Sequence, residues 1–269
     1  MSQPLPRTFS ILTLEAIRDA IRRRIVAVVA GISLLSLMLI DRCTSFRAGT
    51  MTLNDAELDP LNVEGWTSSI TFGVLGLWVI VLAGVLAAEH LAHTLTDGSA
   101  VHTLSRPVGR STFALARLTG ALIIALATGV LLLGGTAFFV YTRYELPLGP
   151  AALAGLLCAL GAIATGALAM SVSLYLPHIA SVLLIFAYVG TVTLANGISL
   201  LAGEPSGILG FVDRYGPPLC TAMAFALSPW FQPLGPEPAT GAVALRLFLW
   251  AGGGLLLLRF VFQRVELRG

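Results

Sequence analysis

The stretch WTSSITFGVLGLWVIVLAGVLAA, Trp66–Ala88, decides the fold class of this chain. It carries no charged side chain, and a transmembrane helix needs about 20 mostly apolar residues to cross roughly 30 Å of hydrocarbon. The whole sequence agrees, because 56% of its 269 residues are hydrophobic and 11% are charged. Soluble domains carry about 25% charged residues. We therefore expect an all-α membrane protein with several transmembrane helices.

Five more apolar runs in the sequence are long enough to cross a bilayer. The six predicted spans are Ile25–Ile40, Trp66–Ala88, Phe113–Val140, Ala151–Leu176, Ile179–Ala202 and Gly241–Phe262. The first span is short, and the arginines that flank it can snorkel to the interface. The fourth and fifth are separated only by Pro177-His178, which predicts a tight hairpin because proline breaks a helix. Residues 1–269 thus form a single polytopic transmembrane domain.

The distribution of arginine predicts the orientation of the spans. With six spans both termini lie on one side, and that side carries Arg7, Arg18, Arg22, Arg23, Arg24, Arg106, Arg110, Arg264 and Arg268. The opposite loops carry fewer arginines and several acidic residues. Cytoplasmic loops are enriched in arginine and lysine. We therefore expect both termini to be cytoplasmic.

Residues Thr8–Arg24 have the pattern of an amphipathic helix that lies along the inner membrane surface. At 100° per residue the apolar side chains share one broad arc, and a charged arc lies opposite. The charged arc holds Glu15, Arg18, Asp19, Arg22 and Arg23. A simpler interpretation is a positively charged flank of the first span, but the apolar arc favours a separate elbow helix.

The segment 89–112, EHLAHTLTDGSAVHTLSRPVGRST, is the most polar inner loop. We expect the second span to end at Glu89 and a short polar helix or pair of turns to follow it. Pro107 and Gly109 break any helix here, and Ser111 is placed to cap the third span. Arg117 lies inside that span, where a charge is costly unless it snorkels or pairs. Glu89 or a lipid phosphate is its expected partner.

The outer segment Gly203–Thr240 is rich in proline but still contains the apolar runs Gly207–Val212 and Leu219–Leu227. These runs are too short to span a bilayer, so we expect short re-entrant or interfacial helices before the last span. In the fourth span small residues recur every three to four positions, at Ala151, Gly155, Ala159, Ala162 and Gly166. Such a surface packs closely against another helix, either within one protomer or in a second subunit.

The sequence predicts no catalytic residues and no metal site. Enzymes within membranes place clustered ionisable groups inside their spans, whereas here Asn196 is the main polar residue at depth. His90 and His93 could share a helix face that holds zinc, but ordinary polar histidines on a hydrated helix are the simpler interpretation. Cys43 and Cys220 both lie on the predicted outer side and could form a disulfide in an oxidising compartment.

Lysine is absent from the sequence, so all 16 basic residues are arginine. This absence excludes a standard phosphate-binding P-loop, which needs a lysine, and Schiff-base catalysis. The net charge of +2 is too small to indicate a nucleic-acid surface. Any ATP hydrolysis would therefore belong to a partner.

An elbow helix, six spans, a polar inner loop and a partly apolar outer segment form a specific combination. The loop contains the acidic residue Glu89, the turn Asp97-Gly98-Ser99 and the sequence Leu104-Ser105-Arg106-Pro107-Val108-Gly109-Arg110. The chain resembles the permease subunit of type-2 ABC transporters, in the branch described as involved in multicopper-enzyme maturation. Gly109 departs from the small hydroxyl residue that is usual in that branch, and histidines replace the charged residues expected after Glu89.

The resemblance implies that Leu91–Thr103 is a coupling helix that docks on a separate ATP-binding subunit. It assigns ATPase coupling to Glu89, His93, Asp97, Gly98, Arg106, Pro107 and Arg110, and contact by the elbow helix to Arg18, Arg22 and Arg23. ATP and magnesium would bind in that partner, and this chain would hold no cofactor. A second permease subunit, identical or related, would complete the translocation path in the inner membrane of a bacterium.

Two other classes fit parts of the same sequence. A non-transporting scaffold or mechanotransmission subunit would use the outer segment Gly203–Thr240 to contact an envelope partner. An intramembrane enzyme would need a buried catalytic pair, which the spans do not offer. The apolar spans argue for a lipid-like or amphipathic cargo and against a small ion.

Overall fold

The computed structural model describes residues 5–22, 31, 35, 38, 52–53, 56–57, 60–96, 109–203, 205–231 and 240–264. Its helices are α1 (Leu5–Arg22), α3 (Pro60–Thr96), α5 (Arg110–Tyr144), α6 (Leu148–Val172), α7 (His178–Ala202), α8 (Gly207–Tyr215), α9 (Leu219–Leu227) and α10 (Thr240–Arg264). A 3-10 turn, Ser228–Trp230, follows α9. The strands β1 (Thr52–Leu53) and β2 (Ala56–Glu57) pair antiparallel.

Five of these helices, α3, α5, α6, α7 and α10, are long and apolar enough to cross a membrane. The prediction of a helical, polytopic membrane protein is therefore confirmed. The predicted first span, 25–40, lies outside the described residues except for Gly31, Leu35 and Met38, which are helical. The count of six spans remains a prediction.

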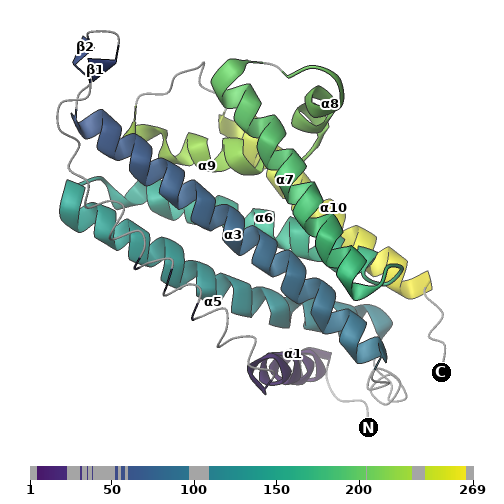
Figure 1. Cartoon of the computed structure of the whole chain (residues 1–269). Coiled ribbons are helices and arrows are strands. Elements are labelled where there is room, and N and C mark those ends of the chain that lie inside the picture. The colour runs from purple at the N-terminus through teal and green to yellow at the C-terminus, as the bar shows by residue number, and fades with distance from the viewer. Residues whose placement is uncertain are drawn as a thin grey trace.

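The five long helices form a bundle around α6 (Figure 1). α3 packs against both α5 and α6, and α10 packs against the other side of α6. Small residues on α6 permit this close approach. At Gly161 an added Cβ would lie 3.0 Å from side-chain carbons of Ile80 and of Leu219. Gly166 packs similarly against Leu118 and Leu122 of α5.

The small-residue surface of α6 divides into two parts. Ala162 and Gly166 are buried inside the protomer, whereas Gly155 and Ala159 are only partly covered. An added Cβ at Gly155 would meet nothing within 4 Å. Ala151 is buried as well, so packing within one protomer covers three of the five small residues and leaves Gly155 and Ala159 partly accessible.

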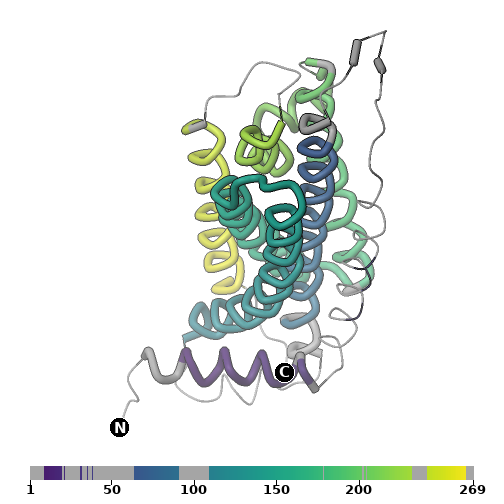
Figure 2. Tube along the Cα trace, turned by 90° about the vertical axis from the view of Figure 1, so that its left-hand side faces the viewer, coloured from purple at the N-terminus to yellow at the C-terminus, as the bar shows by residue number. Residues whose placement is uncertain are grey.

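α1 lies across one end of the bundle, roughly perpendicular to the long helices (Figures 1 and 2). It packs against the start of α5, and Leu12 and Ala16 are its buried apolar residues. Leu14 and Ile21 of the predicted apolar arc are exposed on the protein, where a helix that lies along a membrane surface would contact lipid. Asp19 is half-buried, although the arc placed it among the solvated charges.

The opposite end of the bundle is closed by the short helices of the predicted outer segment. α9 has the predicted bounds, Leu219–Leu227, and packs among α6, α7 and α3. Trp230 is buried behind it and donates its indole N–H to the carbonyl oxygen of Pro147 at 2.9 Å. The backbone of α3 approaches so closely that a Cβ at Gly65 would lie 1.8 Å from the Trp230 carbonyl oxygen.

Several helix boundaries differ from the predicted ones, and α3 already begins at Pro60 instead of Trp66. α3 does not stop at Glu89 but continues to Thr96, because no proline or glycine interrupts it there. α5 begins at Arg110, and its N-cap is Gly109 without a side-chain hydrogen bond, so the prediction that Ser111 caps it is wrong. α6 ends at Val172, and a turn before Pro177 leads into α7, which confirms the predicted hairpin.

The cysteines carry free thiols where they are described. Cys158 is buried in α6 and Cys220 is partly buried in α9, and both are free. Cys43, the other half of the proposed disulfide, lies outside the described residues. Among the described residues no group of three His, Cys, Asp or Glu side chains could hold a metal ion.

Candidate coupling site

The predicted functional residues whose positions the structure describes, among them Arg18, Glu89, Arg110 and Arg117, lie at one end of the bundle, where α1 meets α3 and α5. Arg117, on the second turn of α5, is 5% exposed. Its Nη1 donates to Asp19 Oδ2 of α1 at 3.1 Å, and the two side chains form an ion pair. The predicted partner was Glu89 or a lipid phosphate. Asp19 takes that position because α1 crosses directly beside the start of α5.

The Arg117 guanidinium also lies over an aromatic ring. It lies 5.5 Å from the centroid of the Phe113 ring, one turn earlier on α5. Phe113 in turn stacks on Phe262 of α10, with 6.2 Å between the ring centroids. A cation over an aromatic face gains electrostatic stabilisation that grows with desolvation. The charge is therefore fixed in position by α1, α5 and, through Phe262, α10.

His90 forms the second link to α1. It is 7% exposed, and its Nε2 lies 3.2 Å from the carbonyl oxygen of Ala16. A carbonyl oxygen only accepts hydrogen bonds, so Nε2 carries the proton in this contact. The prediction of a hydrated, ordinary polar histidine is wrong for His90. It connects α3 to the elbow helix where α3 leaves the bundle.

Close backbone contact supports both links. A Cβ at Gly120 of α5 would lie 2.6 Å from the Cβ of Ala16. Only glycine permits this approach without movement of one helix, because real Cβ atoms essentially never come closer than 3.0 Å. Ala16 thus contacts α5 through its side chain and α3 through its carbonyl oxygen.

The remaining predicted coupling residues fall into two groups, those that the structure describes and those that lie outside the described residues. Glu89 is partly buried and Arg110 is exposed at the start of α5, and His93 lies in the last turns of α3. Asp97, Gly98, Arg106 and Pro107 lie outside the described residues. On the elbow helix Arg18 is exposed, Arg22 is the final residue of α1, and Arg23 lies outside the described residues.

Sequence reasoning missed Asp19, His90 and Gly120 as parts of this site. The signal for Asp19 was present, since a buried arginine requires a carboxylate and Asp19 lies at the edge of the apolar arc. The choice among the acidic residues near that end depended on the crossing of α1 over α5, which no local pattern encodes.

Among the described residues this arrangement has no nucleophile and no paired catalytic groups. Its contacts instead hold three helices together. One ion pair, one hydrogen bond and one close helix crossing tie α1 to both helices that flank the 97–108 loop.

Neither a protein-family model nor a curated protein matches this sequence. The geometry of the site and the sequence resemblance described above are thus the basis for a functional proposal.

Proposed function

We propose that this chain is the transmembrane subunit of an ATP-binding-cassette transporter, coupled to a separate ATPase through the end of α3 and the loop that follows it. One observation carries the proposal: the elbow helix α1 is joined to α3 by His90 and to α5 by Arg117. Of the segment Leu91–Thr103, which the resemblance assigns as a coupling helix, residues 91–96 form the last turns of α3, and the rest lies outside the described residues, between α3 and α5 in the sequence. A partner bound there would move three helices together.

The topology supports a sixth span. α1 contacts the His90 end of α3, whereas Pro60 begins α3 at the opposite end. The chain between Arg22 and Pro60 must therefore pass from one end of the bundle to the other. The apolar run 25–40 is placed to make this crossing. Six spans bring both termini to the α1 side, which the arginine distribution assigns to the cytoplasm of a bacterial cell.

The mechanism is alternating access. ATP closes two nucleotide-binding subunits, which carry the ATP and magnesium, and the coupling loops move with them. The permease chain pairs with a second copy or a related chain, and the pair shifts between inward-facing and outward-facing states. This chain supplies the path and the joint, and its partner supplies the hydrolysis.

Co-purification tests the class of protein. The chain, tagged and extracted in mild detergent, is expected to bring with it an ATPase that carries a Walker motif. Recovery of a stable protein with no associated ATPase, in detergent and in nanodiscs alike, would contradict the proposal.

Substitution tests the assignment of the coupling loop. Glu89→Gln and Arg106→Gln are expected to leave assembly intact and to uncouple ATP hydrolysis from transport. Arg143→Gln is the matched control, because Arg143 lies on the last turn of α5 at the far end of the bundle. Coupling that is unchanged in both variants would remove this loop from the proposal.

A second candidate is an ATP-driven scaffold that transmits force to an envelope partner without moving a substrate. The exposed face of α8 favours it, since Ile208, Phe211 and Tyr215 all project away from the protein at the far end of the bundle. Vesicles that hydrolyse ATP while no lipid or amphipathic cargo moves would support this alternative.

A further inference from the structure

The short helix α8 presents an apolar face that is exposed on the protein. Ile208 is 81% exposed, Phe211 65% and Tyr215 57%. At about 100° per residue these three side chains share an arc roughly 60° wide. The rings of Phe211 and Tyr215 lie together, with 4.9 Å between their centroids. Asp213 points to the opposite side of the helix, so α8 is amphipathic across its width.

The polar side of α8 is bonded to α7 at a known level. Asn196 Nδ2 donates to Asp213 Oδ1 at 2.9 Å. Asn196 precedes the last residue of α7, Ala202, by six positions, which is about 9 Å of helix. It belongs to the segment Ile179–Leu201, which is apolar enough to cross a membrane. α8 therefore lies to the side of α7 and not beyond its end (Figure 1).

The C-terminal end of α8 is bonded to α10 at a similar level. Arg246 Nε donates to the carbonyl oxygen of Gly216 at 2.7 Å, and Trp250 donates its indole N–H to that of Tyr215 at 3.0 Å. These side chains lie about 9 Å and 15 Å from the first residue of α10, Thr240. Both belong to a second segment that is apolar enough to span. Contacts with two spans thus fix the level of α8.

This level coincides with the edge of the hydrocarbon. α7 and α10 each have 25 residues, or about 37 Å of helix, and the hydrocarbon core is roughly 30 Å thick. Points about 9 Å from the helix ends therefore lie about 5 Å inside that core when the spans are centred. Helices that lie in a membrane interface bury their apolar face by about 5–10 Å. The position of α8 matches that depth.

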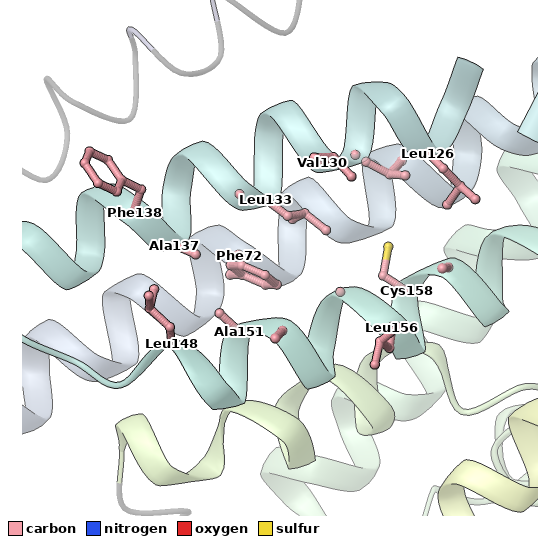
Figure 3. Close-up of a pocket in the computed structure, with 16 residues that line it drawn as sticks. Phe72, Leu126, Val130, Leu133, Ala137, Phe138, Leu148, Ala151, Leu156 and Cys158 are labelled. Atoms are coloured by element: carbon pink, nitrogen blue, oxygen red, sulfur yellow. The ribbon is translucent and has the colours of Figure 1, made fainter. Parts of the chain in front are cut away.

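Exposed apolar side chains surround the bundle at the same distance from its far end. Leu245 and Leu249, which flank Arg246 on α10, are 59% and 64% exposed. Phe138 of α5 is 67% exposed and lies six residues before the end of its helix. It stands on the wall of an apolar groove between α5 and α6 (Figure 3). The apolar face of α8 is therefore continuous in level with side chains that face lipid.

We propose that α8 lies in the leaflet remote from α1, with Ile208, Phe211 and Tyr215 inserted among the acyl chains. Arg214 is exposed beside this face, with its guanidinium carbon 5.9 Å from the centroid of the Tyr215 ring. An arginine at this level extends toward the lipid phosphates, while aromatic rings occupy the boundary below them. The partner of this face is thus phospholipid, with acyl chains at the apolar arc and a phosphate at Arg214.

This placement does not depend on an ATPase partner, so it stands or falls separately from the proposed transport function. It does compete with the scaffold alternative, which assigns the same face to an envelope partner. A partner that approaches from water would have to reach a face that lies beside the spans and below their ends. A measurement of the depth of α8 therefore separates the two occupants.

Site-directed spin labelling of the full-length chain measures this depth. The three native cysteines are replaced by alanine, and a nitroxide is attached after Ile208→Cys, Phe211→Cys or Arg214→Cys. Each variant is reconstituted in vesicles of phosphatidylethanolamine and phosphatidylglycerol. Collisions with oxygen report on hydrocarbon, and collisions with a polar nickel chelate report on water. Leu249→Cys is the lipid-facing control, and Glu145→Cys, in the exposed turn after α5, is the water-facing control.

We expect the ratio of oxygen to nickel collisions at the positions of Ile208 and Phe211 to equal that at Leu249. It should exceed the ratio at Glu145 by about tenfold, because a polar chelate is excluded from hydrocarbon. The position of Arg214 should give an intermediate ratio, since its side chain lies at the level of the headgroups. These results together would support insertion of α8 with its apolar arc toward the acyl chains.

Two outcomes would overturn the proposal. A ratio at Ile208 and Phe211 equal to that at Glu145 would place the face in water, where the scaffold alternative requires it. Low collision rates with both reagents at these two positions would mean that protein covers the face, either from a second copy of the chain or from another subunit. Neither outcome would bear on whether an ATPase co-purifies with the chain.

Discussion

The two ends of the bundle each contain a partly or fully buried arginine, and the two guanidinium groups have different partners. At the α1 end Arg117 pairs with the carboxylate of Asp19, a residue 98 positions away in the sequence. At the far end Arg246 of α10 donates through Nε to the carbonyl oxygen of Gly216 at 2.7 Å and through Nη2 to that of Asp213. Trp250 adds a bond to the Tyr215 carbonyl oxygen at 3.0 Å.

The two arginines differ in the groups to which they donate: a side-chain carboxylate for Arg117 and backbone carbonyl oxygens for Arg246. Arg246 and Trp250 cap the carbonyl groups at the C-terminal end of α8, where helix carbonyls lack internal partners and basic side chains are favourable. These contacts persist as long as α8 is folded. The Arg117–Asp19 contact at the α1 end thus depends on two side-chain charges and on the docking of α1, whereas the Arg246 contacts at the far end depend on backbone carbonyl groups.

The largest expected effect follows from removal of the charge on α1. Asp19→Leu leaves the Arg117 guanidinium buried without its partner, and breaking a buried pair in this way costs about 3 kcal/mol. The free energy of unfolding in mixed micelles measures the loss. Glu15→Leu is the matched control, since Glu15 is an exposed acid on the same helix.

Substitution of the other member of the ion pair, Arg117, tests the same contact. Arg117→Met should cost less than Asp19→Leu, because the Asp19 side chain is 42% exposed and can be hydrated when left alone, whereas that of Arg117 is 6% exposed. Equal losses in the two variants would show that the pair is not the origin of the stability difference.

The second effect concerns the helix crossing at the same end. Gly120→Ala forces α1 and α5 apart, because the new Cβ would overlap that of Ala16. Overpacking of this kind costs about 1–3 kcal/mol. Hydrogen exchange of α1 should rise while that of α9 stays constant. Gly134→Ala, where the Cβ has open space, is the control and should leave both rates unchanged.

At the far end a substitution of the arginine should have a smaller and more local effect. Arg246→Met removes the bonds to the carbonyl groups at the end of α8, with an expected cost of about 1.5 kcal/mol. Hydrogen exchange should rise in α8 and not in α1. A rise in α1 of the same size would mean that the two ends are coupled and would remove the contrast between them.

The sequence was a good guide where local chemistry decides the structure. Leu219–Leu227 is an apolar run between Pro218 and Pro229, and its predicted bounds are those of α9. Pro177 is the N-cap of α7, whereas α6 already ends at Val172. The spans 113–140 and 241–262 each needed an extension of at most four residues at either end, because polar residues at helix ends continue the hydrogen-bond ladder.

The sequence was a poor guide where contacts join distant segments. The apolar part of α3 ends at His90, close to the predicted end of the span at Glu89, but the polar residues that follow continue the same helix to Thr96 instead of forming a separate helix or pair of turns. Asp19 and Arg117 meet only because α1 lies across α5. The same amphipathic pattern would also allow α1 to be rotated about its axis so that Asp19 faces away from α5. The groove was equally hidden, since the small residues of α6 gave no indication of which half another helix covers.

The smallest expected effect belongs to Asn196 of α7, and it tests whether the far end depends on a buried contact between two side chains. Asn196 is fully buried, and its Nδ2 donates to Asp213 Oδ1 at 2.9 Å. Its Oδ1 has no hydrogen-bond partner among the described residues. Asn196→Leu removes one bond and also removes one unsatisfied oxygen, and these contributions oppose each other.

Hydrogen bonds between membrane helices average about 0.6 kcal/mol, so Asn196→Leu should change the free energy of unfolding by no more than about that amount. Thr191→Val, which removes a local hydroxyl on the same helix, serves as the control. A loss above about 2 kcal/mol would mean that Oδ1 is satisfied by a bound water molecule or polar ligand. The far end would then depend on a buried polar contact, as the α1 end does. The contrast between the two ends would no longer hold.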